Sequence, residues 1–426
     1  MKKELNREKM ILWAKELFPI CRSITGNGLL ETLKYLKKIN SSLTIYKVRS
    51  GTKVYDWNIP DEWNIEESYL EHESGKRFAE FKKNNLHVVN YSAPVNKIIN
   101  LKDLKDKIYS DPKKPKWIPY VTSYYNKKWG FCMSHNEKQK LPKGEYRAVI
   151  KSKFSKGHLY YGDILIKGKL EKEILFSTYV CHPSMANNEL SGPVLSSYIA
   201  RYIKEYFPNS KYSYRFIFVP ETIGAITYIK RNINKLKKNV IAGYVLSCVG
   251  DERAYSMIKS RNENSLADQA LYSALKNKKN FKAYSYLDRG SDERQYCAPG
   301  VDLPVAGFCR SKYGEYPEYH TSADNFNVVT AKGLSGSFDI IKNIVDSFEN
   351  SLTVKTNILC EPNLGKRGLY SLTGGKKRNK EIKLRCDLLS YADGNRNIFE
   401  LALLLNVELE DLIKEINILK KKKLIF

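Results

Sequence analysis

The sequence lacks the cysteine spacing of structural zinc sites and redox motifs. Its eight cysteines, at positions 21, 132, 181, 248, 297, 309, 360 and 386, include no C-x-x-C pair. Four of them lie within or beside apolar runs, and we expect these to be buried free thiols: Cys181, Cys248, Cys297 and Cys309. Free thiols are typical of a reducing compartment, so the pattern favours a cytoplasmic protein.

Long apolar runs are also missing. No stretch of about 18 apolar residues occurs, so we expect no membrane span. The N-terminal segment MKKELNREKMILWAKELF lacks the apolar core and the small-residue cleavage site of a signal peptide. Glycine and proline are sparse, with 24 and 15 residues, which argues against long disordered tracts. A chain of 426 residues that is 42% hydrophobic is long enough for two or three domains.

Acidic residues are few relative to basic ones, with 46 Asp+Glu against 72 Lys+Arg and a net charge of +26. One interpretation is a basic surface for nucleic acid, an anionic membrane or an acidic substrate. The alternative is a compositional bias, because Lys, Asn, Ile and Tyr are all abundant and the charge is spread along the chain. We favour the bias, and expect neither nucleic acid nor a membrane as a partner.

The pattern of apolar residues changes along the chain. Helical spacing over 5–18 and 29–39 predicts two opening helices. From about 50 to 139, aromatic and β-branched residues alternate with polar ones, which indicates strands and turns. From about 145 to 350, strand-like runs alternate with helix-like runs at 191–207, 221–238, 263–279 and 332–349. Such alternation predicts a sheet covered by helices.

We therefore predict an α/β fold with a mixed, largely parallel sheet flanked by helices, formed by residues 1–49 and 140–355. Residues 50–139 form an inserted, mostly β subdomain, which either covers the site crevice or makes the interface of a homo-oligomer. Residues 360–426 carry three short helical patterns and form a small winged helix-turn-helix-like domain. This domain is open to two interpretations, DNA binding or a protein-interaction and packing role, and we favour the second.

Four residues with metal-binding or acid–base side chains follow strand-like runs or precede helix-like ones. His182 comes directly after the apolar run that ends at Cys181, and Glu221 follows the run FIFVP. Asp251 follows VLSCVG, and His320 lies in a polar loop before the helix expected at 332. Ligands collect where the carboxyl ends of parallel strands meet. Each carboxylate taken singly is also explained as a helix N-cap, but the coincidence of four favours one site.

These residue types suit a metal-dependent hydrolase. Zinc held by two imidazoles and one or two carboxylates, with open positions, lowers the pKa of bound water toward neutrality. A free carboxylate nearby takes the proton of that water and delivers it to the leaving amine. The four residues are therefore candidates for a zinc centre.

Several segments resemble a known family. They are LFPICRSITGNG (17–28), SGTKVYDWNIPDEWNI (50–65), YVTSYYNKKWGFCMSHN (120–136) and YHTSADNF (319–326). They are similar to the bacterial branch of the zinc aminopeptidases that use co-catalytic metals. The resemblance covers most of the chain, including the inserted subdomain and the C-terminal winged-helix-like module. It also implies a link to the synthesis of surface polysaccharides.

The resemblance implies a role for each candidate. His182 and His320 match the first and last histidine ligands, and Asp251 matches a later aspartate ligand. Glu221 matches the general base. Asp292, in a Ser-Asp pair, resembles a residue near the substrate and behind the metal ligands.

The chain departs from the family at two positions. Asn188 falls where the family has an aspartate that bridges two metals, and Thr222 falls where it has a second acidic ligand. Two negative charges are lost, so we expect one tightly bound zinc, on Asp251 and His320 with help from His182 or Asn188. Glu189 and Asp292 are the acidic residues that could compensate for the lost charges.

Other polar residues of the same segments are candidates for contact with substrate. Arg289 and Arg294 bind a substrate carboxylate or, alternatively, pair with Asp292 and Glu293. Tyr319 is one of several tyrosines that could line a pocket.

The expected activity is that of a zinc-dependent aminopeptidase-like hydrolase, which cleaves a peptide or amide bond next to a free amine. The substrate would be a peptide or an amino-bearing small molecule. Asn188 and Thr222 also allow a second hypothesis, a non-catalytic ligand-binding or regulatory protein built on a peptidase scaffold.

Overall fold

The computed structural model describes residues 5–370 and 380–426. Its centre is an eight-stranded sheet with four parallel strands in the middle and antiparallel neighbours on both sides. In order across the sheet the strands are β1 (Thr44–Arg49), β10 (His158–Ile166), β12 (Ser213–Val219), β11 (Glu173–Tyr179), β13 (Val240–Leu246), β16 (Val305–Cys309), β14 (Tyr255–Ile258) and β15 (Phe281–Tyr284). This confirms the predicted mixed sheet.

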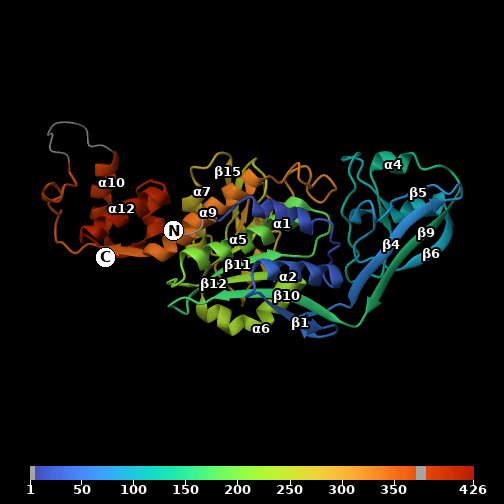
Figure 1. Ribbon diagram of the computed structural model, residues 1–426, viewed down its shortest axis with the longest axis horizontal. Helices are drawn as coiled ribbons and strands as arrows, with labels where there is room; N and C mark the ends of the chain where they lie inside the picture. Colours follow the sequence, from blue (N-terminus) through green and yellow to red (C-terminus); the bar gives the residue numbers. More distant parts are fainter. Residues whose placement is uncertain (1–4, 371–379) are drawn as a thin grey trace.

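Helices cover both faces of the sheet because its central strands are apolar on both sides. Ile174 and Phe176 of β11 belong to one buried cluster, and Leu175 belongs to the other. Figure 1 shows α6 on the opposite side of the sheet from α5 and α1. The first cluster holds α1 (Lys9–Leu17), α2 (Asn27–Ile39), α5 (Ser191–Tyr206), α7 (Leu266–Leu275) and α9 (Ala331–Asn350), and the second holds α6 (Ile223–Asn239) and α8 (Glu293–Tyr296).

The helices expected in the α/β region correspond to α5, α6, α7 and α9. Three strands, β1, β14 and β15, were not expected from the sequence. They lie at or next to the edges of the sheet, and β15 carries only partly buried and exposed residues. Short edge strands of this kind have little apolar periodicity to reveal them.

A second sheet of four strands lies at one end of the molecule (Figure 1). Its strand order is β5-β4-β9-β6, and β9 leads within two residues into β10 of the main sheet. A separate apolar cluster, which includes Leu70 and Phe131, forms its core. The elements here are β4 (Glu62–His72), β5 (Arg77–Phe78), β6 (Val95–Asn100), α3 (Leu101–Leu104), β7 (Ile108–Tyr109), β8 (Phe131–Cys132), α4 (His135–Gln139) and β9 (Glu145–Ser155). A short hairpin of β2 (Lys53–Val54) and β3 (Trp57–Asn58) packs instead on α6 of the α/β domain.

The C-terminal region forms a winged-helix module at the opposite end of the molecule (Figure 1). Its elements are β17 (Thr353–Lys355), α10 (Lys380–Tyr391), β18 (Asp393–Asn397), α11 (Ile398–Leu404) and α12 (Leu409–Lys421). Its buried residues join the same apolar cluster as α5 and α9. The module is therefore packed onto the α/β domain. Among the described residues, no helix combines the length and apolarity needed to cross a bilayer.

Close packing holds the start of α5 against the sheet. A Cβ at Gly192 would lie 2.2 Å from Thr178 Oγ1 and 2.5 Å from the Leu246 carbonyl oxygen. Only glycine fits such an approach. The turn that precedes α5, η3 (Ala186–Leu190), is thereby fixed beside the carboxyl ends of β11 and β13.

Candidate functional site

The candidate site lies at the carboxyl ends of the central parallel strands. His182 follows β11 and Glu221 follows β12, as expected from their positions after apolar runs. Nε2 of His182 lies 3.5 Å from Oε2 of Glu221. An imidazole and a carboxylate from neighbouring strands therefore face each other at the edge of the sheet.

A buried glutamate fixes the orientation of His182. Oε2 of Glu189 lies 3.0 Å from both the backbone nitrogen and Nδ1 of His182. Nε of Arg22 donates a hydrogen bond to the His182 carbonyl oxygen at 2.8 Å. The same Nε lies 3.4 Å from Oε1 of Glu189. Because Nδ1 is used by Glu189, the free ring nitrogen of His182 is the one that faces Glu221.

These neighbours also set the proton affinities. Burial disfavours the imidazolium form of His182, but Cys181 and Glu189 beside it raise its pKa well above the ordinary value. Burial raises the pKa of Glu221, although the His182 and Arg294 charges oppose this shift. A carboxyl group with a raised pKa is better suited to accept and return a proton near neutral pH.

His320 approaches His182 from the loop before α9. Its backbone has a φ of 56°, and its ring stacks on Tyr319 with centroids 3.9 Å apart. The ring centroids of His320 and His182 are 5.6 Å apart. Burial, together with the charges of His182 and Lys114, lowers the pKa of His320 to about 3. Its Nε2 is buried and has no hydrogen-bond partner among the described residues.

Asn188 lies in η3, on the other side of Tyr179. Its Nδ2 donates to the Tyr179 hydroxyl at 2.7 Å, and the Tyr179 ring lies 5.0 Å from the His182 ring between centroids. Its Oδ1 is buried without a partner among the described residues. The Asp324 carboxylate accepts the backbone N–H groups of Asn187 and Asn188 at 2.6 and 2.9 Å, and so fixes the turn.

Asp251, the predicted aspartate ligand, is held by hydrogen bonds from three residues. Its two oxygens accept four hydrogen bonds, from the backbone and hydroxyl of Ser311, the side chain of Asn187 and the backbone of Arg253. The carboxylate is 1% exposed in this arrangement. It connects the end of β13 to η3 and to the loop after β16.

Thr222 and Asp292 are neighbours of Glu221. Thr222 has a φ of 64°, which is an uncommon conformation for a β-branched residue. Its backbone N–H donates to Oδ1 of Asp292 at 2.8 Å, and its hydroxyl accepts from Nη2 of Arg294 at 2.7 Å. Burial and the nearby Glu221 raise the pKa of Asp292 well above its ordinary value. Arg289, by contrast, is exposed and lies over the Tyr286 ring.

The donors around His182 fit one zinc ion. Two imidazoles on one tetrahedral zinc have ring centres about 5 Å apart, given Zn–N distances of about 2.1 Å, and the 5.6 Å between His182 and His320 is compatible with this. The unpartnered atoms, Nε2 of His320 and Oδ1 of Asn188, are acceptors that a cation would satisfy. Among the described residues, the one compact set of three acidic, thiol or imidazole groups is Cys181, His182 and Glu189. Its Glu189 lies on the Nδ1 side of His182, where a supporting carboxylate is usual for a histidine that binds a metal through Nε2.

A cavity of about 470 Å³ opens beside this centre. His182, Glu221 and Arg294 lie on its polar wall. The inserted subdomain and the segment leading into it supply an aromatic wall of Trp57, Tyr124 and Tyr125. Because residues far apart in the sequence complete the cavity, its shape depends on how the subdomain is docked.

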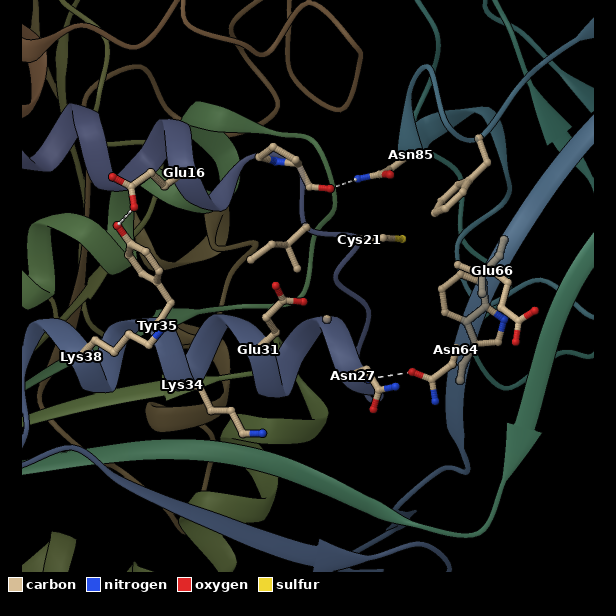
Figure 2. A pocket seen from close by; sticks show the side chains of 16 residues that line it. Glu16, Cys21, Asn27, Glu31, Lys34, Tyr35, Lys38, Asn64, Glu66 and Asn85 are labelled. Carbon is tan, nitrogen blue, oxygen red and sulfur yellow. Dashed lines mark hydrogen bonds between the residues drawn. The ribbon is translucent and has the colours of Figure 1, made fainter.

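A larger cavity, of about 850 Å³, lies between the α/β domain and the second sheet. Figure 2 shows Cys21 and Glu31 directed into it, and the hydrogen bond between Asn27 and Asn64 at its border. No histidine is among the residues that line it, so it lacks the pairing of imidazole and carboxylate found at His182. We therefore place the candidate site in the smaller cavity. Cys21, which precedes Arg22 in the chain, lines the larger cavity.

Two residues that shape the candidate site, Arg22 and Asp324, were missed in the sequence, and Glu189 was considered only as a source of compensating charge. Arg22 and Asp324 lie within the segments that resemble the family, 17–28 and 319–326, and that membership was the available signal. Glu189 lies one residue after Asn188, but nothing in its neighbourhood shows that its carboxylate turns back to His182.

Comparison with known proteins agrees with this architecture. Residues 12–351 match a family model described as a domain of unknown function, DUF4910, and residues 352–426 match a winged helix-turn-helix model. A Clostridium acetobutylicum protein, named as a polysaccharide biosynthesis protein with an aminopeptidase-like domain, is 41% identical over 391 residues. The match covers 91% of this chain and 89% of that protein.

Solved structures show the same fold. A crystal structure of a Clostridium acetobutylicum protein described as a peptidase has a TM-score of 0.91 and 38% identity, and the match covers 99% of this chain and 96% of that one. A zinc aminopeptidase from Bacillus subtilis has a TM-score of 0.57 and 16% identity, over 80% of this chain and 95% of that one. These structures confirm the aminopeptidase-like fold inferred from the sequence. Because the family model matches residues 12–351, which is most of the chain, the protein belongs to the DUF4910 family.

Proposed function

We propose that this protein is a metal-dependent hydrolase that cleaves an amide or peptide bond in the cavity beside His182. The observation that carries the proposal is the buried Nε2 of His320, which has no partner among the described residues and belongs to a ring whose centroid lies 5.6 Å from that of His182. A buried polar atom without a partner is costly unless a ligand satisfies it. The aminopeptidase-like fold supports the same activity.

The residues that would hold one zinc ion are His182 and His320, with the amide oxygen of Asn188. When bound, zinc polarises a carbonyl group and makes water more acidic. Glu221 accepts the proton of the attacking water and returns it to the leaving nitrogen. Glu189 keeps Nδ1 of His182 protonated, so that the opposite nitrogen stays free as a ligand.

Asp251 has a positioning role in this proposal. Its carboxylate already accepts four hydrogen bonds, so we propose that it holds η3 and Asn188 in place. Asn188 and Thr222 bring no charge, which favours one bound metal over two.

A second candidate function is a non-catalytic binding protein on the same scaffold. The observation that favours it is the neutral side chain of Asn188 beside the centre. In either case, the name of the Clostridium acetobutylicum relative supports a role linked to polysaccharide biosynthesis. The free cysteines, most of them buried, support a cytoplasmic location.

The test uses the full chain, purified without chelator and assayed against a panel of dipeptides and N-acylated amino acids. We expect about one zinc per chain by elemental analysis. Glu221→Gln should retain the metal and lose turnover, whereas His320→Ala should lose the metal. Substrate binding without hydrolysis in the zinc-loaded wild type would support the non-catalytic alternative.

A further inference from the structure

The cavity beside His182 contains an arginine that makes no direct ion pair among the described residues, although its charge acts on Glu221 and Asp292. Nη2 of Arg294 donates to the hydroxyl of Thr222. Its Nε is buried and has no hydrogen-bond partner in the described parts of the chain. No carboxylate of these residues lies within ion-pair distance of its guanidinium, although Arg294 lines the same cavity as Glu221.

One oxygen of each acidic neighbour of Arg294 in the sequence accepts hydrogen bonds from other donors, while Oδ2 of Asp292 and Oε2 of Glu293 are buried without a partner among the described residues. Oε1 of Glu293 accepts hydrogen bonds from the backbone of Gly290 and Ser291 and from the hydroxyl of Tyr313. Asp292 accepts the backbone N–H of Thr222. The pairing of Arg294 with Asp292 or Glu293, considered from the sequence, is therefore not formed.

The position of Arg294 is held by a strained residue. Thr222 adopts φ 64° and ψ −79°, and this conformation directs its hydroxyl to the guanidinium. Strained backbone of this kind persists where the surroundings impose it, and it concentrates at functional sites. Nη2 is thereby anchored, and Nη1 makes no hydrogen bond to the described residues, so it remains for a ligand in the cavity.

We propose that Arg294 binds a carboxylate of the substrate. A guanidinium offers two parallel N–H donors that match a carboxylate. The inference rests on the proposed hydrolase function and narrows its substrate class to small amides that carry a carboxylate, such as a dipeptide held by its C-terminus or an N-acyl amino acid. Water adds across the C–N bond of such an amide and gives a carboxylic acid and an amine.

The remaining walls agree with this class. Glu221 is the one carboxylate among the described residues that line the cavity, and as the base it is not free to pair with a substrate ammonium. The aromatic wall of Trp57 and Tyr125, whose ring centroids are 5.5 Å apart, suits an apolar side chain. A volume of about 470 Å³ is in the range of small-molecule sites.

Binding of a matched pair of probes tests the proposal independently of turnover. The probes are N-acetyl-L-phenylalanine and its neutral amide, titrated into the full chain by calorimetry. Zinc also binds carboxylates, so each titration is run on zinc-loaded and on chelator-treated protein. We expect the acid to bind the wild type roughly tenfold to hundredfold more tightly than the amide, as a hydrogen-bonded charge pair would give.

Variants of Arg294 identify the group responsible. Arg294→Gln should remove the preference for the acid, and Arg294→Lys should keep part of it, because lysine retains the charge but not the paired donors. Arg231→Gln, an exposed arginine on the same helix that follows Thr222, is the matched control and should keep the full preference. Circular dichroism and thermal unfolding show that each variant is folded.

The outcomes separate this inference from the proposed function. Equal binding of acid and amide by the wild type, or a preference that survives Arg294→Gln, would overturn it. If the protein hydrolyses neutral amides and this activity depends on Glu221 but not on Arg294, the proposed hydrolase function would stand. The proposal that the substrate carries a carboxylate would be rejected. If the preference for the acid disappears in Arg294→Gln and the wild type hydrolyses no substrate, the result would support the Arg294 site and count against catalysis.

Discussion

Glu189 binds His182 through one oxygen, which lies 3.0 Å from its backbone nitrogen and 3.0 Å from its Nδ1. The second oxygen of Glu189 lies 3.4 Å from Nε of Arg22, and both side chains are fully buried. The carboxylate therefore has two roles, to orient the imidazole and to neutralise a buried guanidinium. Removal of its charge affects both stability and metal binding.

The change Glu189→Gln tests this double role. The amide still accepts one hydrogen bond from His182, but Arg22 is left as a buried cation without a counter-ion. We expect the free energy of unfolding in urea to fall by about 3–5 kcal/mol. Zinc affinity, measured by competition with a chelating dye, should fall roughly tenfold to hundredfold.

The matched control is Glu171→Gln. Glu171 pairs with Lys238, and both side chains are mostly exposed. Loss of such a pair changes stability by about 1 kcal/mol or less. Unfolding of Glu189→Gln at the same urea concentration as the control would contradict the assigned role of Glu189.

Asn188→Asp tests the effect of charge at the centre. The Oδ1 of Asn188 is buried without a partner, and its Nδ2 donates to Tyr179, whose hydroxyl can donate in return to a carboxylate. The variant adds an anionic ligand, so we expect zinc to bind about tenfold more tightly or more. Unchanged zinc affinity, measured by the same dye competition, would mean that this side chain does not face the metal.

Asn187→Asp is the control for that change. Its Nδ2 donates to Asp251 and its Oδ1 accepts from the backbone of Gly250. A carboxylate here would be buried against Asp251 and would lose a donor. We expect a loss of about 3 kcal/mol or more in the free energy of unfolding, with no gain in zinc affinity.

The main fold could be predicted because its central strands are apolar on both faces. Runs such as EILFSTYV stand out in the sequence, and the helices between them have apolar periodicity. The same logic located His182 and Glu221, since each directly follows such a run. The edge strand β15 and its neighbour β14 carry four residues each, which is too few to show a period.

Side-chain directions could not be predicted, because they depend on partners far away in the sequence. Asp251 follows its strand as expected, but donors from Ser311 and Asn187 determine where its carboxylate points. In the same way, Thr222 reaches Arg294 only because its backbone adopts a positive φ. Position after a strand gives the location of a residue, and the tertiary contacts give its role.

His87 makes the stability of the inserted subdomain dependent on pH. It is buried, its Nδ1 lies 2.9 Å from the Cys132 carbonyl, and burial lowers its pKa. The unfolded chain gains a proton at a pKa of about 6.5, whereas the folded state resists protonation until a lower pH. Stability from this residue is therefore present above pH 6.5 and is lost as the pH falls below it.

We expect the urea midpoint of His87→Asn, relative to that of the wild type at the same pH, to be higher at pH 5.5 than at pH 7.5. Fluorescence of Trp129 in the same subdomain reports the transition when other tryptophans are replaced. His158→Asn, at a partly exposed position of β10, serves as the control. A pH dependence that is identical in His87→Asn and the wild type would contradict the prediction.

The third helix of the winged-helix module has an acidic first turn, which disfavours contact with DNA phosphates. This helix, α12, contacts α9, with a hydrogen bond between Asn350 and Asn417 and another from Lys420 to Ser351. Recognition helices contact bases through their N-terminal residues. In α12 the first turn carries the exposed acids Glu410 and Asp411, which repel phosphates.

We therefore expect the full chain to bind duplex DNA only weakly, without sequence preference and with a steep dependence on salt, because only its net positive charge attracts phosphates. The double change Glu410→Lys and Asp411→Lys should strengthen binding if the first turn of α12 is accessible to DNA. The control carries the same charge change at Glu171 and Glu205, which are exposed on the α/β domain. Equal gains in both variants, measured by fluorescence anisotropy, would show that binding follows net charge alone. A selected, salt-resistant DNA sequence would instead mean that α12 is released from α9.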